Sequence, residues 1–202
     1  GSATAAKVNK FGLERLKQEI DWMGKHQIEI VNCCDANFGI FPRDIDIADY
    51  AVEVRKKTGA PKILFIQGVK NATERSYQIQ KKIIDAGMGS LVTLALQSVT
   101  PRTLKSIRRE NISLDTYREL QHRFQKDGVN TYTDMLVGLP GETYDSFADG
   151  VDQVISEGQN HLIQFFNVYI LPNAELAQPA YRKEFGIRTV RLPYSEPLFP
   201  LT

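Results

Sequence analysis

The sequence predicts an α/β fold in which parallel strands form a partial barrel. Short, strongly apolar segments alternate with amphipathic segments along the chain, as in successive βα units. The apolar segments lack the polar alternation of a half-exposed strand, which is typical of strands buried in a parallel sheet. About five βα units are visible, too few to close an eight-stranded barrel, and a helix precedes the first strand. We therefore expect an open barrel whose first strand is missing from this chain.

The predicted strands are apolar segments that end in polar or glycine-containing loops. They cover residues 28–34, 62–68, 91–97, 131–138 and 162–170. The predicted helices carry apolar residues at intervals of three and four. They cover residues 11–25, 44–57, 73–86, 101–109, 114–126, 144–157 and 174–184.

On one of these helices, 144–157, we expect a single apolar face made of Phe147, Val151, Val154 and Ile155. For the whole chain, the prediction is a barrel over residues 1–186. Residues 187–202 contain three prolines, which favour an extended tail that leads to a C-terminal region.

Composition narrows the class of protein. The formal net charge is +1, so the sequence carries no strongly basic surface that would indicate a nucleic-acid partner. No apolar segment reaches the length of a membrane span, and no signal peptide opens the chain. The two cysteines, Cys33 and Cys34, are adjacent, which argues against a disulfide framework and for a reducing, cytoplasmic location. We expect them to be buried strand residues, and the chain offers no metal site of its own.

Polar residues follow the predicted strands at their carboxyl ends, where the sites of parallel α/β folds are built. This rim includes Asp35, Asn37, Gln67, Gln97 and Ser98, and the loop from Gly138 to Glu142. Glycine lets the backbone turn sharply and lets a flat ligand approach closely, although a Gly-Leu-Pro-Gly loop is equally compatible with a simple turn. The rim therefore predicts a site for a polar small molecule. It contains no serine–histidine or cysteine–histidine constellation, so no catalytic residue is assigned.

Four segments, each at a strand end and in the right order, resemble the motifs of radical S-adenosylmethionine (radical SAM) enzymes. The segment from Leu94 to Ser98, followed by Arg109, is similar to their fourth-strand signature. Residues 135–143 resemble the fifth-strand glycine motif, and residues 171–175 the sixth-strand proline segment. Residues 35–39 are similar to the second-strand motif of the subgroup that carries an amino-terminal cobalamin-binding domain. The resemblance covers about residues 7–191.

The resemblance implies a six-stranded partial barrel and an enzyme that reductively cleaves S-adenosylmethionine to a 5′-deoxyadenosyl radical. It implies a four-iron, four-sulfur (4Fe-4S) cluster and, for this subgroup, cobalamin and a methyltransferase activity. By position, Asp35 and Asn37 would lie near the methionine end of the cofactor, with Gln67 beside them on the rim. Gln97 and Ser98 would reach the ribose, and Arg109 the methionine carboxylate. The adenine would be lined by Val137, Gly138, Leu139, Leu171 and Asn173.

The sequence departs from the family at the cluster. The family's Cys-x3-Cys-x2-Cys motif is absent, and Cys33 and Cys34 do not match it. The simplest interpretation is a fragment that begins after the cluster loop and is inactive alone. The alternatives are a non-catalytic barrel that binds a small molecule or serves in assembly, and an unrelated partial barrel for another metabolite. Because a missing first strand exposes a sheet edge, we also expect the chain to form a homodimer or to cover that edge with its tail.

Overall fold

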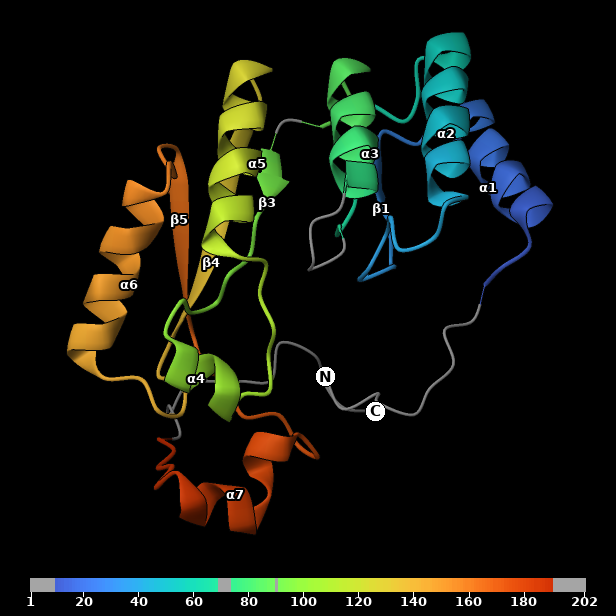
Figure 1. The fold of residues 1–202 in the computed structure, drawn as a ribbon. Coiled ribbons are helices and arrows are strands. Elements are labelled where there is room, and N and C mark those ends of the chain that lie inside the picture. Colours follow the sequence, from blue (N-terminus) through green and yellow to red (C-terminus); the bar gives the residue numbers. More distant parts are fainter. Residues whose placement is uncertain (1–9, 69–73, 90, 191–202) are drawn as a thin grey trace. The chain divides into compact units, whose positions relative to one another are not determined.

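The computed structural model describes residues 10–68, 74–89 and 91–190, in which helices alternate with strands (Figure 1). The strands are β1 (Ile30–Asn32), β2 (Ile63–Phe65), β3 (Leu91–Thr93), β4 (Asn130–Val137) and β5 (Leu162–Asn167). The helices are α1 (Leu13–Lys25), α2 (Asp44–Thr58), α3 (Glu74–Asp85), α4 (Pro101–Ser106), α5 (Leu114–Lys126), α6 (Tyr144–Ser156), the 3-10 helix η1 (Glu175–Ala177) and α7 (Pro179–Glu184).

Every strand pairing is parallel, as predicted, but the strands form two sheets. β1 pairs with β2, and β4 lies between β3 and β5. The backbone N–H of Leu64 on β2 donates to the carbonyl of Met88, just before β3, at 2.8 Å. This bond joins the two sheets at the amino-terminal ends of their strands. The architecture is α/β with parallel strands, consistent with a partial barrel.

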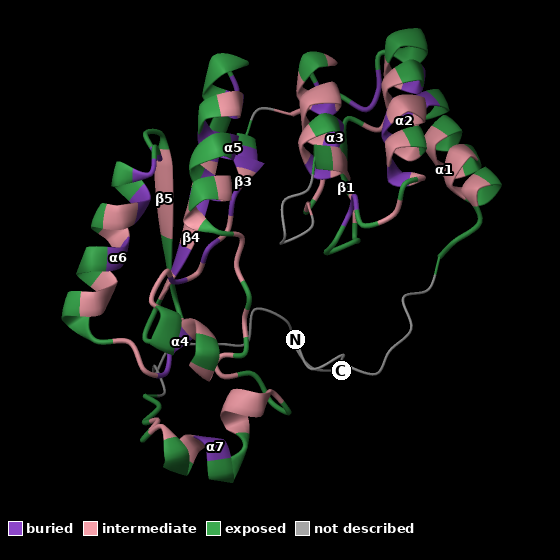
Figure 2. Ribbon diagram, in the orientation of Figure 1, coloured by how far each residue is buried: buried purple, intermediate pink, exposed green. Residues whose placement is uncertain are grey.

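Two apolar cores lie between the strands and the helices (Figure 2). The larger core joins the β3 segment and β4 to α5 and α6. Its fully buried members are Val92, Leu94, Leu96, Tyr117, Leu120, Phe124, Val129, Met135 and Val154. The smaller core lies under α2 and α3 and is built from Phe38, Ala48, Ala51, Ile79, Ile83 and Met88.

Local signals explain where the helices of the larger core begin. Ser113 caps α5, its hydroxyl accepting from the N–H of Thr116 at 3.1 Å. Thr143 and Ser146 form a reciprocal capping box at the start of α6. The glycine loop before α6 is therefore fixed on its helical side by the sequence that follows it.

Some element predictions are wrong in detail. The strands predicted at 28–34, 62–68 and 91–97 are each three residues long. On α6, Ile155 is 54% exposed whereas Val154 is fully buried, so Ile155 does not belong to the buried face. The helix predicted at 174–184 is interrupted at Pro179, because proline lacks an N–H and forces the preceding Gln178 into an extended conformation.

The described residues divide into two compact units, 10–167 and 168–190. The first contains all five strands, and the second contains η1 and α7. In the second unit, Tyr181 and Phe185 stack with ring centroids 4.6 Å apart. The predicted domain boundary at 186–187 stays a prediction, and most of the predicted tail lies outside the described residues. Within the described ranges, no helix is both long enough and apolar enough to cross a membrane.

Candidate functional site

A bulge after β3 places Gln97 at the carboxyl end of the sheet. Leu91 pairs with Asn130, whereas Gln97 pairs with Met135, so six steps along one strand match five along the other. One extra residue in one strand is a β-bulge, a feature often found beside functional sites. Gln97 has φ +65°, a left-handed conformation that is uncommon for residues other than glycine. Its backbone is nonetheless paired on β4: its N–H donates to the Asp134 carbonyl at 2.7 Å, and its carbonyl accepts from the Leu136 N–H at 2.8 Å.

Arg109 and Asn111 hold the carbonyl groups of the bulge. Arg109 donates from Nη2 to the Ala95 carbonyl at 2.8 Å and from Nε to Asn111 Oδ1 at 2.7 Å. Asn111 Nδ2 donates to the carbonyls of Leu96 and Ser98, both at 2.8 Å. Burial lowers the pKa of the Arg109 guanidinium from its usual very high value. The structure thus brings Arg109 together with the segment that carries Gln97 and Ser98.

Glu142, from the glycine loop, binds the β3–α4 loop. Its Oε1 accepts from Ser98 Oγ at 3.1 Å and from Thr100 Oγ1 at 2.7 Å. Ser98 is only 1% exposed, so its hydroxyl is directed to this contact inside the protein. The other carboxylate oxygen of Glu142 is buried without a hydrogen-bond partner among the described residues. Glu142 therefore joins the two loops that carry most of the predicted site.

Asp134 is a further candidate that the sequence analysis did not single out. Along β4, Thr133 and Met135 are buried against the helices, so Asp134 faces the opposite side of the sheet, in register with Gln164 on β5. Asp134 Oδ1 is buried and has no hydrogen-bond partner among the residues that the structure describes. Burial raises the pKa of this carboxyl group. A lone carboxylate within a buried strand was the sequence signal that could have identified it.

The glycine loop after β4 is open at one glycine and packed at the other. Gly138 has φ +91°, and no described atom lies within 4 Å of the position that a Cβ would occupy. Gly141 has φ +82°, and its Cβ position lies 3.1 Å from Ser106 Oγ of α4. Val137 is 41% exposed, whereas Leu139 is buried. The Cβ position of Gly138 therefore faces open space beside the exposed Val137.

Asp35, Asn37 and Gln67 form a second group, at the carboxyl ends of β1 and β2. The Asn37 N–H donates to Asp35 Oδ1 at 2.8 Å, and the Phe38 N–H donates to the Gln67 carbonyl at 3.0 Å. All three predicted residues are exposed. The remaining pair, Leu171 and Asn173, belongs to the 168–190 unit, where Leu171 is 65% exposed and Asn173 has φ +63°.

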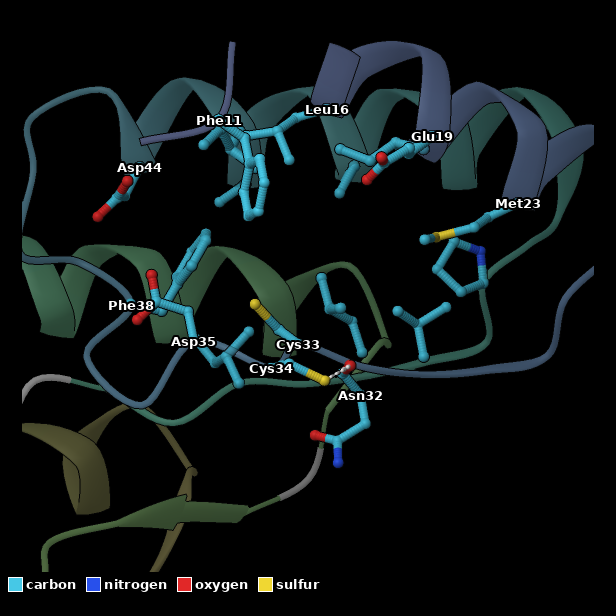
Figure 3. Close-up of a pocket in the computed structure, with 18 of the residues that line it drawn as sticks. Phe11, Leu16, Glu19, Met23, Asn32, Cys33, Cys34, Asp35, Phe38 and Asp44 are labelled. Atoms are coloured by element: carbon cyan, nitrogen blue, oxygen red, sulfur yellow. Dashed lines mark hydrogen bonds between the residues drawn. The ribbon is translucent and has the colours of Figure 1, made fainter. Parts of the chain in front are cut away.

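A cavity of about 510 Å³ lies between the helices α1 and α2 and the strands β1 and β2 (Figure 3). Of the predicted site residues, it includes Asp35. Cys33 and Cys34 also line it, but their sulfur atoms point in different directions (Figure 3). Cys34 is exposed, so the expectation that both cysteines are buried strand residues is wrong; both follow the end of β1. Burial raises the pKa of the Cys33 thiol.

The described residues do not provide the ligands of an iron–sulfur cluster. None of their histidine, cysteine, aspartate and glutamate side chains form a group of three or more that could hold a metal ion. The rim at β3 and β4 instead carries a buried carboxylate oxygen without a partner among the described residues and an open glycine, Gly138.

Comparison with known proteins shows which family the sequence matches. The model of the radical SAM superfamily matches residues 6–154. The cobalamin-dependent radical SAM methyltransferase TokK of Streptomyces tokunonensis is 41% identical over 94% of this chain and 28% of its own length. A 2-(S-pantetheinyl)-carbapenam-3-carboxylate methyltransferase of Streptantibioticus cattleyicolor is 40% identical over 99% of this chain and 30% of its own.

A solved structure shares the fold. The radical S-adenosylmethionine methyltransferase TsrM of Kitasatospora setae, solved with tryptophan and a SAM analog, superposes with a TM-score of 0.60 at 15% identity. The match covers 77% of this chain and 30% of that one. The chain thus spans less than a third of the length of these relatives, and it matches the family model over most of its own residues. This chain belongs to the radical SAM superfamily.

Proposed function

We propose that the ends of β3 and β4 bind the adenosyl part of S-adenosylmethionine, and that this chain is the cofactor-binding part of a cobalamin-dependent radical SAM methyltransferase. The observation that carries the proposal is the buried Oδ1 of Asp134, which has no hydrogen-bond partner among the described residues and lies adjacent in the sheet to the bulged Gln97. A buried carboxylate without a partner is costly, and a ligand with hydroxyl donors would satisfy it. In this family, bound S-adenosylmethionine supplies a 5′-deoxyadenosyl radical.

Each residue of the rim has a role that fits its position. Asp134 would accept hydrogen bonds from ribose hydroxyls, and Gln97 would contact the same sugar. The open backbone at Gly138 and the exposed face of Val137 would lie against the adenine. Arg109 uses Nε and Nη2 within the protein, which leaves Nη1 for the methionine carboxylate. Ser98 would act through Glu142, by fixing the loop.

The other predicted contacts stay part of the proposal. Asp35, Asn37 and Gln67 are exposed at the neighbouring sheet, where they could meet the methionine end of the cofactor. Leu139 is buried and would shape the loop rather than touch the ligand. We extend the proposal to methyl transfer but not to a particular substrate, because substrate contacts come largely from loops and flanking domains.

A second candidate is a non-catalytic barrel that binds the cofactor or another small molecule. The two candidates separate in a polypeptide that joins this chain to a three-cysteine segment. After anaerobic reconstitution with iron and sulfide, addition of S-adenosylmethionine and a reductant is expected to yield 5′-deoxyadenosine, measured by chromatography. Asp134→Asn in the same polypeptide should form much less product. A sample that holds a cluster and forms no 5′-deoxyadenosine would support the non-catalytic barrel.

We also propose that the chain forms a homodimer through the free edge of β1. Among the described strands β1 pairs only with β2, and Ile30 on β1 is 60% exposed. Unpaired strand edges offer backbone groups to a second chain. Light scattering after size exclusion should give twice the mass of one chain, and the amides of β1 should be protected from hydrogen exchange. A monodisperse monomer with rapidly exchanging β1 amides would refute the dimer.

A further inference from the structure

We propose that Asn111 is a positioning residue that sets both Gln97 and Arg109, so that the ribose contact and the carboxylate contact of the site depend on one amide side chain. The proposal rests on the proposed function for the identity of the ligand. The geometric part of the proposal, that Asn111 fixes the bulge, is independent of the proposed function.

The first step is the conformation of Gln97. A non-glycine residue held at φ +65° is strained, and such strain persists only where surrounding contacts over-determine the backbone. The two bonds to β4 involve the N–H and the carbonyl of Gln97 itself. They leave the carbonyl groups on either side of Gln97, those of Leu96 and Ser98, to be held by something else.

The second step is the orientation of the Asn111 amide. Its Nδ2 carries two hydrogens, and the two donate to the Leu96 and Ser98 carbonyls, so the amide spans Gln97. Its Oδ1 accepts from Arg109 Nε at 2.7 Å. Both donors and the acceptor are therefore used in a single orientation, which an aspartate or a leucine of similar size cannot reproduce.

The third step is the coupling to Arg109. The guanidinium is half-buried, and its two recorded acceptors are the Ala95 carbonyl and Asn111 Oδ1. Without Oδ1, one of the two contacts that aim Nη1 is lost. Asn111 is not itself placed to bind ligand, since its polar atoms are engaged with the protein. It acts through Arg109, which it contacts, and through Gln97, whose neighbouring carbonyl groups it holds.

The test compares the whole chain with Asn111→Asp, which keeps the size of the side chain and removes both N–H donors. Asn160→Asp, at an exposed position between α6 and β5, makes the same chemical change outside the site and serves as the control. Hydrogen exchange measured by NMR reports the bulge without any ligand. We expect exchange at the Gln97 amide to rise about tenfold in Asn111→Asp, while amides shared by β4 and β5 are unchanged.

Binding of S-adenosylhomocysteine and of 5′-deoxyadenosine, which lacks the carboxylate, reports the coupling. Asn111→Leu, which also removes the Oδ1 acceptor of Arg109, should weaken both, by about tenfold or more for S-adenosylhomocysteine and by less for 5′-deoxyadenosine, because only the former uses Arg109. Unchanged exchange at Gln97 in Asn111→Asp would overturn the positioning role, whatever the ligand does. Equal losses for the two ligands would overturn the coupling to Arg109. If exchange at the Gln97 amide rises in Asn111→Asp but the unsubstituted chain binds neither ligand, the proposed function is wrong. The conclusion that Asn111 fixes the bulge would then still be supported.

Discussion

Asp134→Asn is expected to stabilise the chain at neutral pH and, at the same time, to weaken its binding of S-adenosylmethionine. The Asp134 carboxylate is partly buried with one oxygen unpaired, and burial raises its pKa. The amide removes a charge that the fold does not compensate, which should add about 1 kcal/mol to the free energy of unfolding. The same change removes one of the acceptors proposed for the ribose hydroxyls, so the dissociation constant should rise about tenfold or more.

The stability difference between wild type and Asp134→Asn should depend on pH, because it follows the charge of Asp134. Because the pKa of Asp134 is higher in the folded than in the unfolded chain, the folded state binds the proton more tightly. Burying the ionised Asp134 carboxylate lowers the free energy of unfolding. This penalty is absent below the ordinary aspartate pKa, grows as the pH rises through that value, and is complete above the raised pKa of the folded state. Wild type and Asp134→Asn should therefore unfold alike in acid and diverge towards neutral pH.

The measurement is thermal unfolding across this pH range, together with titration calorimetry of S-adenosylmethionine. Asp152→Asn, at an exposed position on α6, is the matched control and should change neither quantity. A loss of stability at neutral pH in Asp134→Asn would show that the carboxylate has a structural partner. Unchanged affinity would remove Asp134 from the site.

Thr133→Val is expected to have the largest effect on stability. Thr133 is fully buried on β4, and its Oγ1 lies 2.6 Å from the Tyr117 hydroxyl and accepts from Gln159 Nε2 at 3.0 Å. Gln121 Nε2 donates in turn to the Tyr117 hydroxyl at 2.7 Å. Valine has the same shape but leaves the Gln159 N–H and the Tyr117 hydroxyl without this partner inside the core. We expect the free energy of unfolding to fall by about 2–4 kcal/mol, because these buried polar groups lose their contact with water without gaining a hydrogen bond in the protein.

Thr93→Val is the matched control, since it makes the same exchange on the neighbouring strand β3, outside this network. Chemical unfolding should show a markedly lower midpoint for Thr133→Val than for Thr93→Val. Similar midpoints for the two variants would mean that the buried network contributes little. The network matters to the site because Thr133 precedes Asp134, so the bonds that fix one residue on the helical side of β4 also set the direction of the next.

The order and type of the elements could be predicted from sequence because they rest on local patterns. Apolar residues at intervals of three and four determine the helix faces, and glycine ends the helices. Where the predictions fail, a local signal was overlooked or a tertiary contact decides. Pro179 was visible within the predicted last helix, and proline interrupts it for a local reason. Ile155 and Val154 both fit the helical spacing, and which of the two is buried depends on what packs against α6, which no local pattern encodes.

In the candidate site too, some features follow from local sequence and others depend on tertiary contacts. Motifs place Gln97, Arg109 and the glycine loop at strand ends, and the structure brings these residues together. The bulge that turns Gln97 to φ +65° arises from a register change between β3 and β4, which is a property of two strands far apart in sequence. Asn111 is recognised only from its partners, since it uses every polar group of its side chain. Asp134 stands out in the structure because one oxygen lacks a partner among the described residues, although its lone carboxylate in an apolar strand was already visible in the sequence.

The most direct test of the adenosyl site is an NMR titration of the isotope-labelled chain with S-adenosylmethionine. We predict that the amide signals of Gln97, Asp134 and Gly138 shift first and furthest. Asp134→Asn should abolish these shifts at the same ligand concentration. Shifts confined to residues of the cavity between α1 and β1, or no shifts at all, would contradict this prediction. The chain would still belong to the family, but it would have no adenosyl site at β3 and β4.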